Sequence, residues 1–539
     1  MPSGFQESTA FSGLANPTAI SFAPDGRIFV GEKSGLIKVF DGLGDSTPTT
    51  VADLRTEVHN FWDRGLLGMT LDPQFPTQPY IYALYALDAE PGGTPPRWGA
   101  ANTSNDPCPA RTETPPGPGA TGDGCVVTGR LARLTLTGST MSAKTNLLTD
   151  WCQQFPSHST GDLDFGADGA LYVTGGDGAS FNYVDWGQDG VSGADGFPGN
   201  PCGDPPGGAT LTPPTAEGGA LRSQDARTTA DPTSLDGAVL RVNPATGEGM
   251  PGNPFAGSSD PNQRRIAAFG LRNPFRFTIR PGTNEVWVGD VGWNTWEEIN
   301  RLVTPGDSTA DNFGWPCYEG AARQGGYDGV NLNLCENLYT QGAGAVVAPY
   351  YAYDHSAKVV GGETCPAGSS SISGLGFYQS GPFPDSYGGA LFFSDYSRDC
   401  IWAMLPGAGG LPNPANIQTF DAGAANPVDL EISPQGDLFY ADLDGGTIRR
   451  VHHPAGNQAP TAVATATPSS GAAPLNVQLD ASGSSDPDDA PDELSFAWDL
   501  DDDGAFDDST AVAPTYTYAQ PGTHIATVRV SDPLGASDT

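Results

Sequence analysis

His158 is the residue best placed for proton-transfer chemistry in this 539-residue chain. It lies immediately before an alternating strand pattern, and Asp177 follows the second strand of the same expected hairpin. Since the first and last residues of a two-stranded unit lie at one end of it, the two side chains can meet. A carboxylate that holds one imidazole nitrogen fixes the tautomer and raises the basicity of the other, as a general base requires. The alternative is a histidine that only stabilises a loop.

Arg272 and Asn273 form a second polar pair ahead of an expected strand, in the segment FGLRNPFRF at positions 269–277. An arginine is always charged and offers donors in fixed directions, which suits an anionic cofactor or a developing oxyanion. The alternative for this pair is an ion pair on the rim of the molecule.

A third segment, GDVGWNTWEEIN at positions 289–300, combines glycines, two tryptophans and two adjacent acids. Calcium prefers several oxygen ligands, which are often backbone carbonyls, so this segment is a candidate calcium site. The adjacent acids Glu297 and Glu298 are otherwise typical of a solvated turn.

A fourth segment places acids at positions 1, 3, 5 and 9 of a loop, with Gly504 at position 6, as at the front of an EF-hand. These acids are Asp499, Asp501, Asp503 and Asp507. The bidentate glutamate expected at position 12 is Thr510 instead. We therefore predict a structural calcium here and no sensor role.

Short strands must position these residues. One unit recurs, an alternating stretch, a Pro-Asp-Gly-like turn and a second alternating stretch, at Ile20–Val30, Leu163–Val173 and Leu430–Tyr440, with a variant at Phe275–Val288. Such hairpins, repeated over roughly 450 residues, predict an all-β propeller whose blades cannot bury their own faces until the ring closes. Apart from a turn around Trp296–Leu302, no segment has a convincing helical period.

Two stretches, residues 87–124 and 179–232, are expected to be long loops on one rim that shape a pocket. Residues 454–459 form a linker, and residues 460–539 form a separate small β unit with the segment WDLDDDG at 498–504. The chain stops where a last strand is expected, so we expect this unit to be clipped.

Composition limits the partners and the compartment. The net charge of −38 repels phosphate backbones and anionic membranes, so nucleic-acid binding is excluded, and no apolar run reaches the length of a membrane span. The eight cysteines fall into the neighbouring couples Cys108 and Cys125, Cys152 and Cys202, Cys317 and Cys335, and Cys365 and Cys400. An even number without CxxC motifs predicts disulfides in a secreted protein whose leader has been removed, although the spacing leaves their pairing open.

Around His158, Arg272 and residues 289–300, together with residues 63–75, 235–241 and 312–316, the sequence resembles the glucose/sorbosone dehydrogenase family. The resemblance covers roughly residues 8–452. It implies a six-bladed β-propeller over residues 1–453 that binds pyrroloquinoline quinone (PQQ) and calcium on its axis. The segment after residue 460 resembles a PKD-type immunoglobulin-like β-sandwich, which would contact polysaccharide or a cell surface.

The resemblance also implies roles for individual residues. His158 matches the general base and Asp177 the acid that orients it, while Arg272 and Asn273 match the pair that contacts the quinone. The backbone carbonyls of Gly292 and Trp293 match those that hold calcium. Asp63 lies where the family often has Gln or Glu near the cofactor.

The sequence departs from the family pattern at two basic positions. Members that bind PQQ tightly carry a lysine where this chain has Ser397, with Arg398 beside it as the candidate replacement, and one or two arginines where this chain has Asn426. PQQ has three carboxylates, and each charge-assisted contact is worth about 1.5–3 kcal/mol.

The resemblance implies a secreted PQQ- and calcium-dependent aldose dehydrogenase that oxidises a sugar or oligosaccharide hydroxyl and passes electrons to an external acceptor. The departures favour an alternative, a non-catalytic propeller that binds glycans or proteins without PQQ. A second alternative is a calcium-dependent lactonase or other hydrolase, which would need a cage of Glu, Asn and Asp side chains on the axis.

Overall fold

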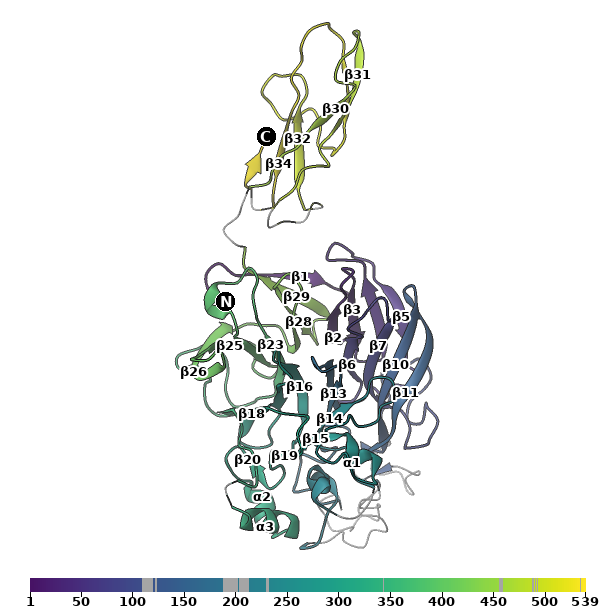
Figure 1. Cartoon of the computed structure of the whole chain (residues 1–539), viewed down its shortest axis with the longest axis vertical. Coiled ribbons are helices and arrows are strands. Elements are labelled where there is room, and N and C mark those ends of the chain that lie inside the picture. The colour runs from purple at the N-terminus through teal and green to yellow at the C-terminus, as the bar shows by residue number, and fades with distance from the viewer. Residues whose placement is uncertain are drawn as a thin grey trace. The chain divides into compact units, whose positions relative to one another are not determined.

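The computed structural model describes residues 1–108, 120–121, 124–187, 202, 213–228, 232–342, 344–454, 459–486, 489, 491, 493–533 and 535–539. It divides into two compact units, Glu7–Val451 with Met1–Ser3, and His452–Thr539 with Gly4–Gln6 (Figure 1). The described part of the chain is sheet-rich, and none of its helices has the length and apolar character needed to cross a bilayer.

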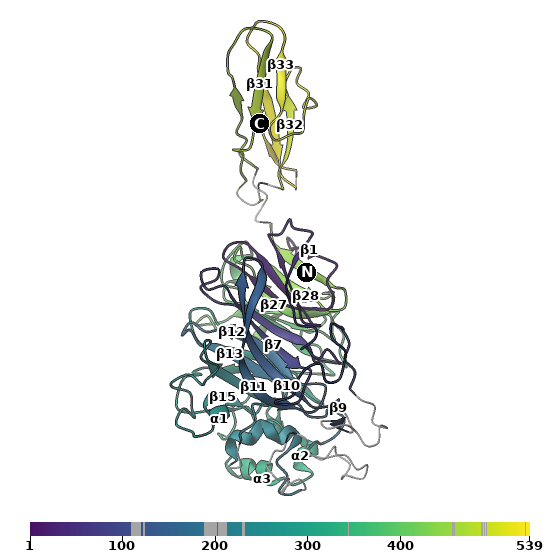
Figure 2. The ribbon, with the colours of Figure 1, turned by 90° about the vertical axis from the view of Figure 1, so that its right-hand side faces the viewer.

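Six sheets of four or five strands make up the described larger unit (Figures 1 and 2). Their first strands are β2 (Pro17–Phe22), β6 (Leu66–Leu71), β12 (Thr160–Phe165), β16 (Pro274–Ile279), β23 (Ile372–Phe377) and β27 (Pro427–Ile432). Their second strands are β3 (Ile28–Glu32), β7 (Tyr80–Leu87), β13 (Leu171–Gly175), β17 (Val286–Asp290), β24 (Leu391–Asp395) and β28 (Leu438–Asp442). Their third strands are β4 (Leu36–Phe40), β10 (Val127–Thr137), β14 (Ala238–Val242), β18 (Trp296–Leu302), β25 (Cys400–Pro406) and β29 (Thr447–His452).

The outer strands complete the sheets. They are β5 (Thr49–Asp53), β11 (Thr140–Gln153), β15 (Ile266–Phe269) with the short parallel β19 (Asp311–Asn312), β22 (Tyr351–Asp354), β26 (Pro412–Asp421) and β1 (Gln6–Phe11). β1 lies beside β29, so the first strand of the chain completes the sheet formed by the last strands of this unit. The first strands contact one another in the closed order β2, β6, β12, β16, β23, β27 and back to β2.

The four recurrent hairpins of the sequence are the first two strands of the sheets that begin with β2, β12, β16 and β27. The turn glycines Gly26, Gly169 and Gly436 have φ angles of 91°, 75° and 91°, a conformation that favours glycine. Each first strand also carries a register irregularity close to its start. These lie between Pro17 and Ala19, Leu66 and Gly68, Thr160 and Leu163, Pro274 and Arg276, Ile372 and Leu375, and Pro427 and Leu430. Bulges bend strands and re-aim side chains, and here they lie at the end where His158 and Arg272 precede their strands.

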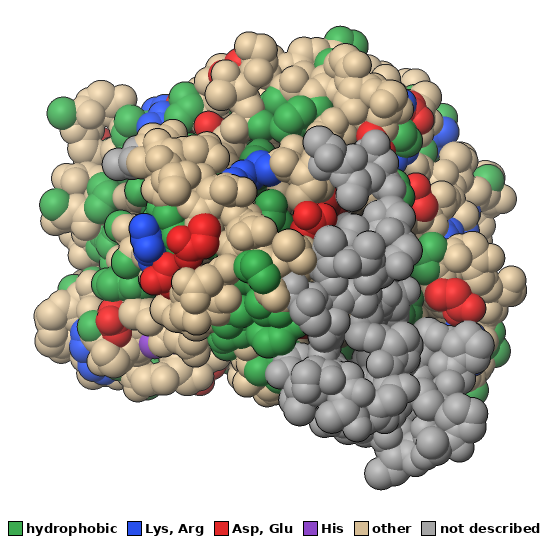
Figure 3. Space-filling model, turned by 90° about the horizontal axis from the view of Figure 1, so that it is seen from below, with side chains coloured by type: hydrophobic (Ala, Val, Ile, Leu, Met, Phe, Trp, Pro, Cys, Tyr) green, Lys and Arg blue, Asp and Glu red, His purple; other side chains and the backbone are tan. Residues whose placement is uncertain are grey.

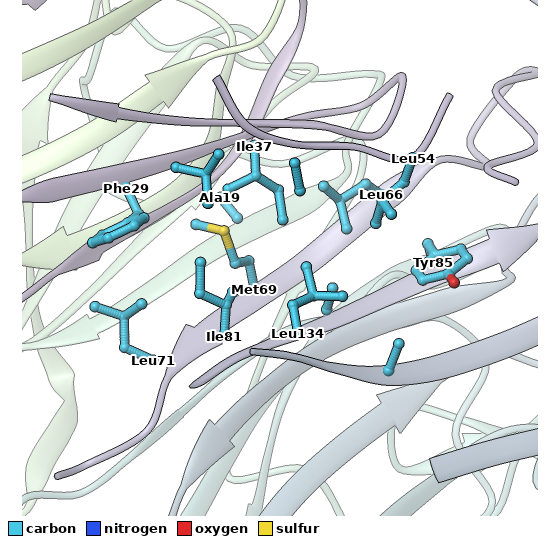
Figure 4. Packing of buried hydrophobic residues seen from close by; sticks show 14 of the residues in the cluster. Ala19, Phe29, Ile37, Leu54, Leu66, Met69, Leu71, Ile81, Tyr85 and Leu134 are labelled. Carbon is cyan, nitrogen blue, oxygen red and sulfur yellow. The ribbon is translucent and has the colours of Figure 1, made fainter. Parts of the chain in front are cut away.

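The core of the larger unit lies between neighbouring sheets. Phe29 and Ile37 of one sheet join Met69 and Ile81 of the next in one buried cluster (Figure 4). Because each sheet buries its faces only against its neighbours, the closed contact order is a condition for the stability of every sheet.

Helices and short strands lie outside the six sheets. They are η2 (Gly219–Arg227, a 3₁₀ helix), α1 (Pro261–Arg265), α2 (Gly325–Asp328), α3 (Asn333–Thr340), η3 (Asp385–Tyr387, a 3₁₀ helix), and the pairs β8 (Ala120–Thr121) with β9 (Gly124–Cys125) and β20 (Tyr318–Glu319) with β21 (Ala322–Arg323). Half of the expected loop 179–232 lies outside the described residues, and η2 occupies part of the rest. The predicted helical turn at Trp296–Leu302 is wrong, because this segment is β18, paired with β17 and β22. Its apolar residues Trp296, Ile299 and Leu302 recur at every third position, a spacing that also occurs in helices.

Four disulfides join the neighbouring cysteine couples, Cys108–Cys125, Cys152–Cys202, Cys317–Cys335 and Cys365–Cys400. The predicted disulfides are confirmed, and the structure settles the pairing that the spacing left open.

The smaller unit has two three-stranded sheets within its described residues. One contains β30 (Thr465–Thr467), β31 (Leu475–Asp480) and β33 (Thr515–Tyr518), and the other contains β32 (Ser495–Asp499), β34 (Thr527–Ser531) and β35 (Ser537–Asp538). Trp498 of β32 is fully buried and shares one apolar cluster with Val477 and Leu479 of the other sheet and with Val528 of its own. The core of this unit therefore draws on both sheets.

Candidate functional site

His158 and Asp177 lie together at the end of the β12–β13 hairpin. Thr160 and Gly175, the first residue of β12 and the last of β13, are paired, so the residues beside them are held close. Nδ1 of His158 lies 2.9 Å from Oδ1 of Asp177. A side chain at Gly176 would reach to 2.4 Å from the His158 carbonyl oxygen, so a glycine is needed for this close approach.

The Asp177 carboxylate accepts two hydrogen bonds besides that of His158. Trp315 Nε1 donates to Oδ2 at 2.8 Å, and the Ala179 amide donates to Oδ1 at 3.0 Å. The Asp177 amide donates to the Arg272 carbonyl at 2.8 Å. Because these donors keep the carboxylate an acceptor toward His158, the imidazole carries its proton on Nδ1 and leaves the Nε2 lone pair available.

The surroundings of His158 favour the neutral imidazole. The side chain is buried, and its backbone is held in the left-handed region, with φ of 49°. Burial and the nearby Arg272 charge lower the pKa of His158 below its ordinary value of 6.5, against the opposing effect of Asp177. A neutral imidazole at neutral pH is the form that can accept a proton.

Arg272 and Asn273 are fixed by Asp290, the last residue of β17. The Arg272 and Asn273 amides donate to Asp290 Oδ1 at 3.1 and 2.6 Å. The Arg272 guanidinium donates through Nη1 to the carbonyls of Val291 at 2.8 Å and Gly292 at 2.7 Å, and lies 5.5 Å from the Trp315 ring centroid. Within the described residues it pairs with no carboxylate, so the rim ion pair is not formed there. Trp315 thus contacts both the Asp177 carboxylate and Arg272.

The acid at the end of the second strand is a repeated structural device. Glu32, Asp290 and Asp395 each close a second strand and accept backbone amides that precede the first strand, such as Ala15 to Glu32 at 2.9 Å and Ser371 to Asp395 at 2.9 Å. In the β12 sheet the acid lies two residues beyond the strand and holds an imidazole instead. Asp177 therefore occupies nearly the same place as acids that stabilise the fold in other sheets, but it binds a histidine side chain.

The segment Gly292–Trp296 wraps around Glu319. One carboxylate oxygen of Glu319 accepts the amides of residues 293, 294, 295 and 296 at 3.0, 2.9, 2.8 and 3.2 Å. The Gly292 carbonyl, expected to bind calcium, accepts from Arg272, while no hydrogen bond to the Trp293 carbonyl is formed within the described chain. The solvated turn considered for Glu297 and Glu298 is wrong, because both are buried.

Asp63 lies beside the His158 segment. Its carboxylate accepts the Ser157 hydroxyl, and its charge acts on His158. Lys33, which directly follows β3, donates to Asn60 Oδ1 at 2.6 Å. Burial lowers the pKa of Lys33 to about 8, against the opposing charge of Asp63. Sequence reasoning missed Lys33, although its position after a second strand, like those of Asp177 and Ser397, was a signal for it.

Within the described residues, Arg398 makes no hydrogen bond or ion pair with His158, Asp63 or Lys33, because its side chain is enclosed by other residues. Its side chain is 0% exposed, and it donates to Ser370 Oγ and to the carbonyls of Asp354, His355 and Ala357 at 2.8–3.0 Å. Its Nε also lies 3.6 Å from Asp395.

The two positions that lack a basic residue make polar contacts of their own. The Ser397 hydroxyl lies 2.9 Å from that of Ser371, and the Asn426 side chain donates to Asp442 at 3.4 Å. Neither position supplies a cation.

The acidic loop of the smaller unit is partly assembled. Carboxylate oxygens of Asp499, Asp501 and Asp503 lie within 4.8 Å of one another, whereas Asp507 is not in this group. Asp508 instead accepts the Leu500 amide at 2.6 Å. The calcium expected there stays a prediction.

The opposite ends of the first strands surround an acidic cavity of about 160 Å³. Asp164 of β12 and Asp429 and Glu431 of β27 line it, with Arg276 3.5 Å from Asp429. Burial raises the pKa of Asp164 to about 6 and of Asp429 to about 7, and it raises the pKa of Glu431 well above its ordinary value.

Neutralising Glu431 is expected to stabilise the larger unit at alkaline pH. The folded state holds protons on these acids that the unfolded chain releases near pH 4, so stability falls as pH rises from about 4 to 7. Glu431→Gln should raise the free energy of unfolding by about 1–2 kcal/mol at pH 8 and leave it unchanged at pH 4, measured by denaturant titration. The exposed Asp41→Asn is the control, and destabilisation of Glu431→Gln at pH 8 would contradict the prediction.

The end of the larger unit that carries β20, α2 and α3 exposes apolar side chains among acidic and basic ones (Figure 3). Trp315, three residues before β20, links this end to Asp177. Its segment NFGWP was visible in the sequence, but nothing there joined it to Asp177, 138 residues away.

Among curated proteins, HIPL1 of Arabidopsis thaliana is 24% identical over 448 residues, which cover 76% of this chain and 55% of the relative. HIPL2 of the same plant is 33% identical over 156 residues, which cover 28% of this chain and 20% of the relative. The chain therefore spans about half or less of the length of these relatives.

Two solved structures share the fold. The PQQ-bound aldose sugar dehydrogenase of Streptomyces coelicolor has a TM-score of 0.52 and 18% identity over 84% of this chain and 99% of that one. The apo form of the Escherichia coli aldose sugar dehydrogenase has a TM-score of 0.53 and 17% identity over 83% and 99%. A family model described as Glucose / Sorbosone dehydrogenase matches residues 14–190 and 219–402, and a PKD domain model matches residues 457–539. Because the first of these matches covers well over half of the sequence, the chain belongs to the glucose/sorbosone dehydrogenase family and carries a PKD domain at its C-terminal end.

Proposed function

We propose that this protein is a PQQ-dependent sugar dehydrogenase that uses His158 as its general base. The observation that carries the proposal is the buried set of hydrogen bonds that joins His158 to Asp177 and Asp177 to Trp315. The pKa of His158 is lowered there, and Arg272 lies close by. Nε2 of His158 takes the proton of a sugar hydroxyl, Asp177 stabilises the imidazolium through Nδ1, and Trp315 keeps the carboxylate in place.

The residues present fit a carboxylated quinone with a different set of cations from that of the family. Nε and Nη2 of Arg272 make no hydrogen bond within the described chain, and Lys33 adds a second cation near Asp63. Arg272, Asn273, Asp63 and Lys33 would hold the quinone, and the Gly292 and Trp293 carbonyls would hold calcium. Bound PQQ would supply the two-electron acceptor. We leave Arg398 out of this set because its guanidinium is enclosed.

We further propose that the six sheets are the blades of one propeller and that the smaller unit is an immunoglobulin-like sandwich. The closed contact order of the first strands supports the former, and the shared core of two sheets supports the latter. Four disulfides support secretion. An external electron acceptor would complete turnover, and the PKD domain would hold the enzyme near polysaccharide or a cell surface.

A glycan- or protein-binding propeller without PQQ is the second candidate. It is favoured by the absence of a cation at Ser397 and Asn426 and by the enclosure of Arg398. The lactonase has less support, because the described axial acids do not converge as a group of three metal ligands.

Reconstitution separates these candidates. The purified protein, incubated with PQQ and calcium, should develop the quinone absorbance and reduce a dye in the presence of aldoses. No bound quinone and no turnover on any sugar would refute the dehydrogenase, and hydrolysis of a lactone panel would favour the hydrolase.

The pH dependence of His158 provides a test that needs no cofactor. Because burial and Arg272 lower its pKa, the His158 ring should titrate below pH 6.5 in an NMR titration of the protein without PQQ. Arg272→Met removes a positive neighbour and should raise this pKa, whereas Arg280→Met, the control, should leave it unchanged. Kinetics of the reconstituted enzyme provide a second check. The base form of His158 is populated above its pKa, so kcat/KM of the wild-type enzyme should stay level from pH 8 to below 6.5. A fall of kcat/KM that begins above pH 7 would contradict this.

A further inference from the structure

One exposed aromatic side chain, Phe181, lies beside His158, and a second, Trp62, lies beside Phe181. Trp62 is 52% exposed and Phe181 is 37% exposed, and both stand among the few large apolar side chains that the described residues leave in solvent. The Phe181 ring centroid lies 6.0 Å from the His158 ring and 6.4 Å from the Trp62 ring. Phe181 therefore connects the His158 ring to the Trp62 ring, and we refer to these three rings as the aromatic row.

Neighbouring side chains hold this row in place. Trp62 stacks on Phe61 at 5.7 Å and meets the edge of the buried Phe155 at 5.8 Å, and Phe155 also packs against Phe181 at 5.3 Å. The Trp293 indole donates to the Phe181 carbonyl at 2.7 Å. Trp62 is also kept in the left-handed region, with φ of 50°, which is unfavourable for a bulky residue. The Trp62 indole stays exposed to solvent although its backbone is strained and its ring packs against the buried Phe155. Such an exposed apolar ring suits a ligand that covers it.

Polar groups gather around Asp63, the residue that follows Trp62. Asp63 accepts the Ser157 hydroxyl, and Lys33 and Asn60 form a hydrogen-bonded pair next to Asp63. The flat apolar face of the Trp62 indole matches the C–H face of a pyranose, and the carboxylate, amine and amide around Asp63 are groups that can bind sugar hydroxyls. A ligand without net charge suits these groups, because they carry both signs of charge.

We propose that Trp62 is the platform of a second sugar subsite, which rests on the proposed function of His158. The reacting ring lies at His158 against Phe181, and the adjoining ring of a disaccharide or of an oligosaccharide end stacks on Trp62. The distances between successive ring centroids, 6.0 and 6.4 Å, are comparable to the size of one sugar ring. The site therefore selects substrates of at least two rings over free monosaccharides. Trp62 thereby determines specificity and takes no part in proton transfer.

Binding to the protein without PQQ tests the subsite directly. Cellobiose, maltose and glucose are titrated calorimetrically into wild type, Trp62→Ala, Trp62→Phe and the exposed control Leu43→Ala. We expect Trp62→Ala to weaken binding of at least one disaccharide about 10-fold and to leave glucose unchanged, with Trp62→Phe close to wild type. Equal losses for glucose and disaccharides, no loss at all, or no sugar binding by wild type would overturn the proposal.

Two further measurements separate this inference from the dehydrogenase itself. If Trp62→Ala weakens PQQ binding and not disaccharide binding, the platform belongs to the quinone and the subsite is refuted. If the reconstituted enzyme oxidises glucose and disaccharides and Trp62→Ala leaves their KM ratio unchanged, the subsite is refuted and the dehydrogenase stands. If no sugar is oxidised while the disaccharide-specific loss persists, the subsite stands and the dehydrogenase is refuted.

Discussion

Replacing His158 with alanine is expected to lower kcat of the reconstituted enzyme by about 10²–10⁴-fold, the usual contribution of a positioned general base. Its Nε2 is the ring nitrogen that Asp177 does not contact, and its lowered pKa keeps it neutral near pH 7. Steady-state dye reduction with a sugar panel, together with a PQQ titration, measures turnover and cofactor affinity separately. We expect the PQQ affinity to change much less than kcat.

Asp177→Asn tests how the base is held. The amide is nearly the same size as the carboxylate, but it can donate to Nδ1 and so favour the wrong tautomer, and it no longer stabilises an imidazolium. We expect a loss of kcat close to that of His158→Ala, and a double variant no worse than either single one. His355→Ala is the control, because His355 pairs with Glu297 at 2.7 Å and not with Asp177. Turnover of His158→Ala within threefold of wild type would refute the assignment of the base.

Arg398→Met is expected to destabilise the larger unit by about 3–5 kcal/mol, because it removes one partner from a fully buried ionic group. The guanidinium joins Asp395 of β24 to the carbonyls of Asp354, His355 and Ala357, so its loss leaves the buried Asp395 carboxylate without its cation and removes one donor from each of these carbonyls. Denaturant unfolding of the full chain measures the loss. Arg280→Met, at a partly exposed arginine, should change stability much less.

The same variant separates a structural role from cofactor binding. With the protein kept in its folded range, the PQQ affinity of Arg398→Met should stay within about threefold of wild type, whereas that of Arg272→Met should fall about 10-fold or more. An Arg398→Met protein of unchanged stability that binds PQQ 10-fold more weakly would return Arg398 to the cofactor site. That outcome would require the loop at residues 354–370 to move away from the guanidinium.

The cations near His158 bear directly on the choice between oxidation and simple binding. Lys33 is one of four lysines in the chain, and the structure places it next to Asp63 with a lowered pKa. A quinone held by Arg272 and Lys33 would keep the arginine that the family pattern implies, but it would take its second cation from the end of β3 and not from the positions of Ser397 and Asn426. The departures at Ser397 and Asn426 are therefore compatible with a relocated cation.

The sequence by itself determined the features that lie within one hairpin. Alternating strands and glycine-containing turns predicted the first two strands of four of the six sheets, and the hairpin register placed Asp177 beside His158, 19 residues apart. It also determined the family, the PKD domain and the disulfides, which the comparisons and the structure confirm. Within a hairpin, strand pairing alone decides which side chains meet, so local patterns suffice.

Only the tertiary structure decided the contacts between sheets. It brought Trp315 to Asp177 and Lys33 to Asp63, enclosed Arg398, buried Glu297 and Glu298, and gathered acids of β12 and β27 around the acidic cavity. A period of two shows which face of a strand is buried, but not which sheet will cover it. That choice is made when the first strands close their ring, and it decides which side chains surround His158.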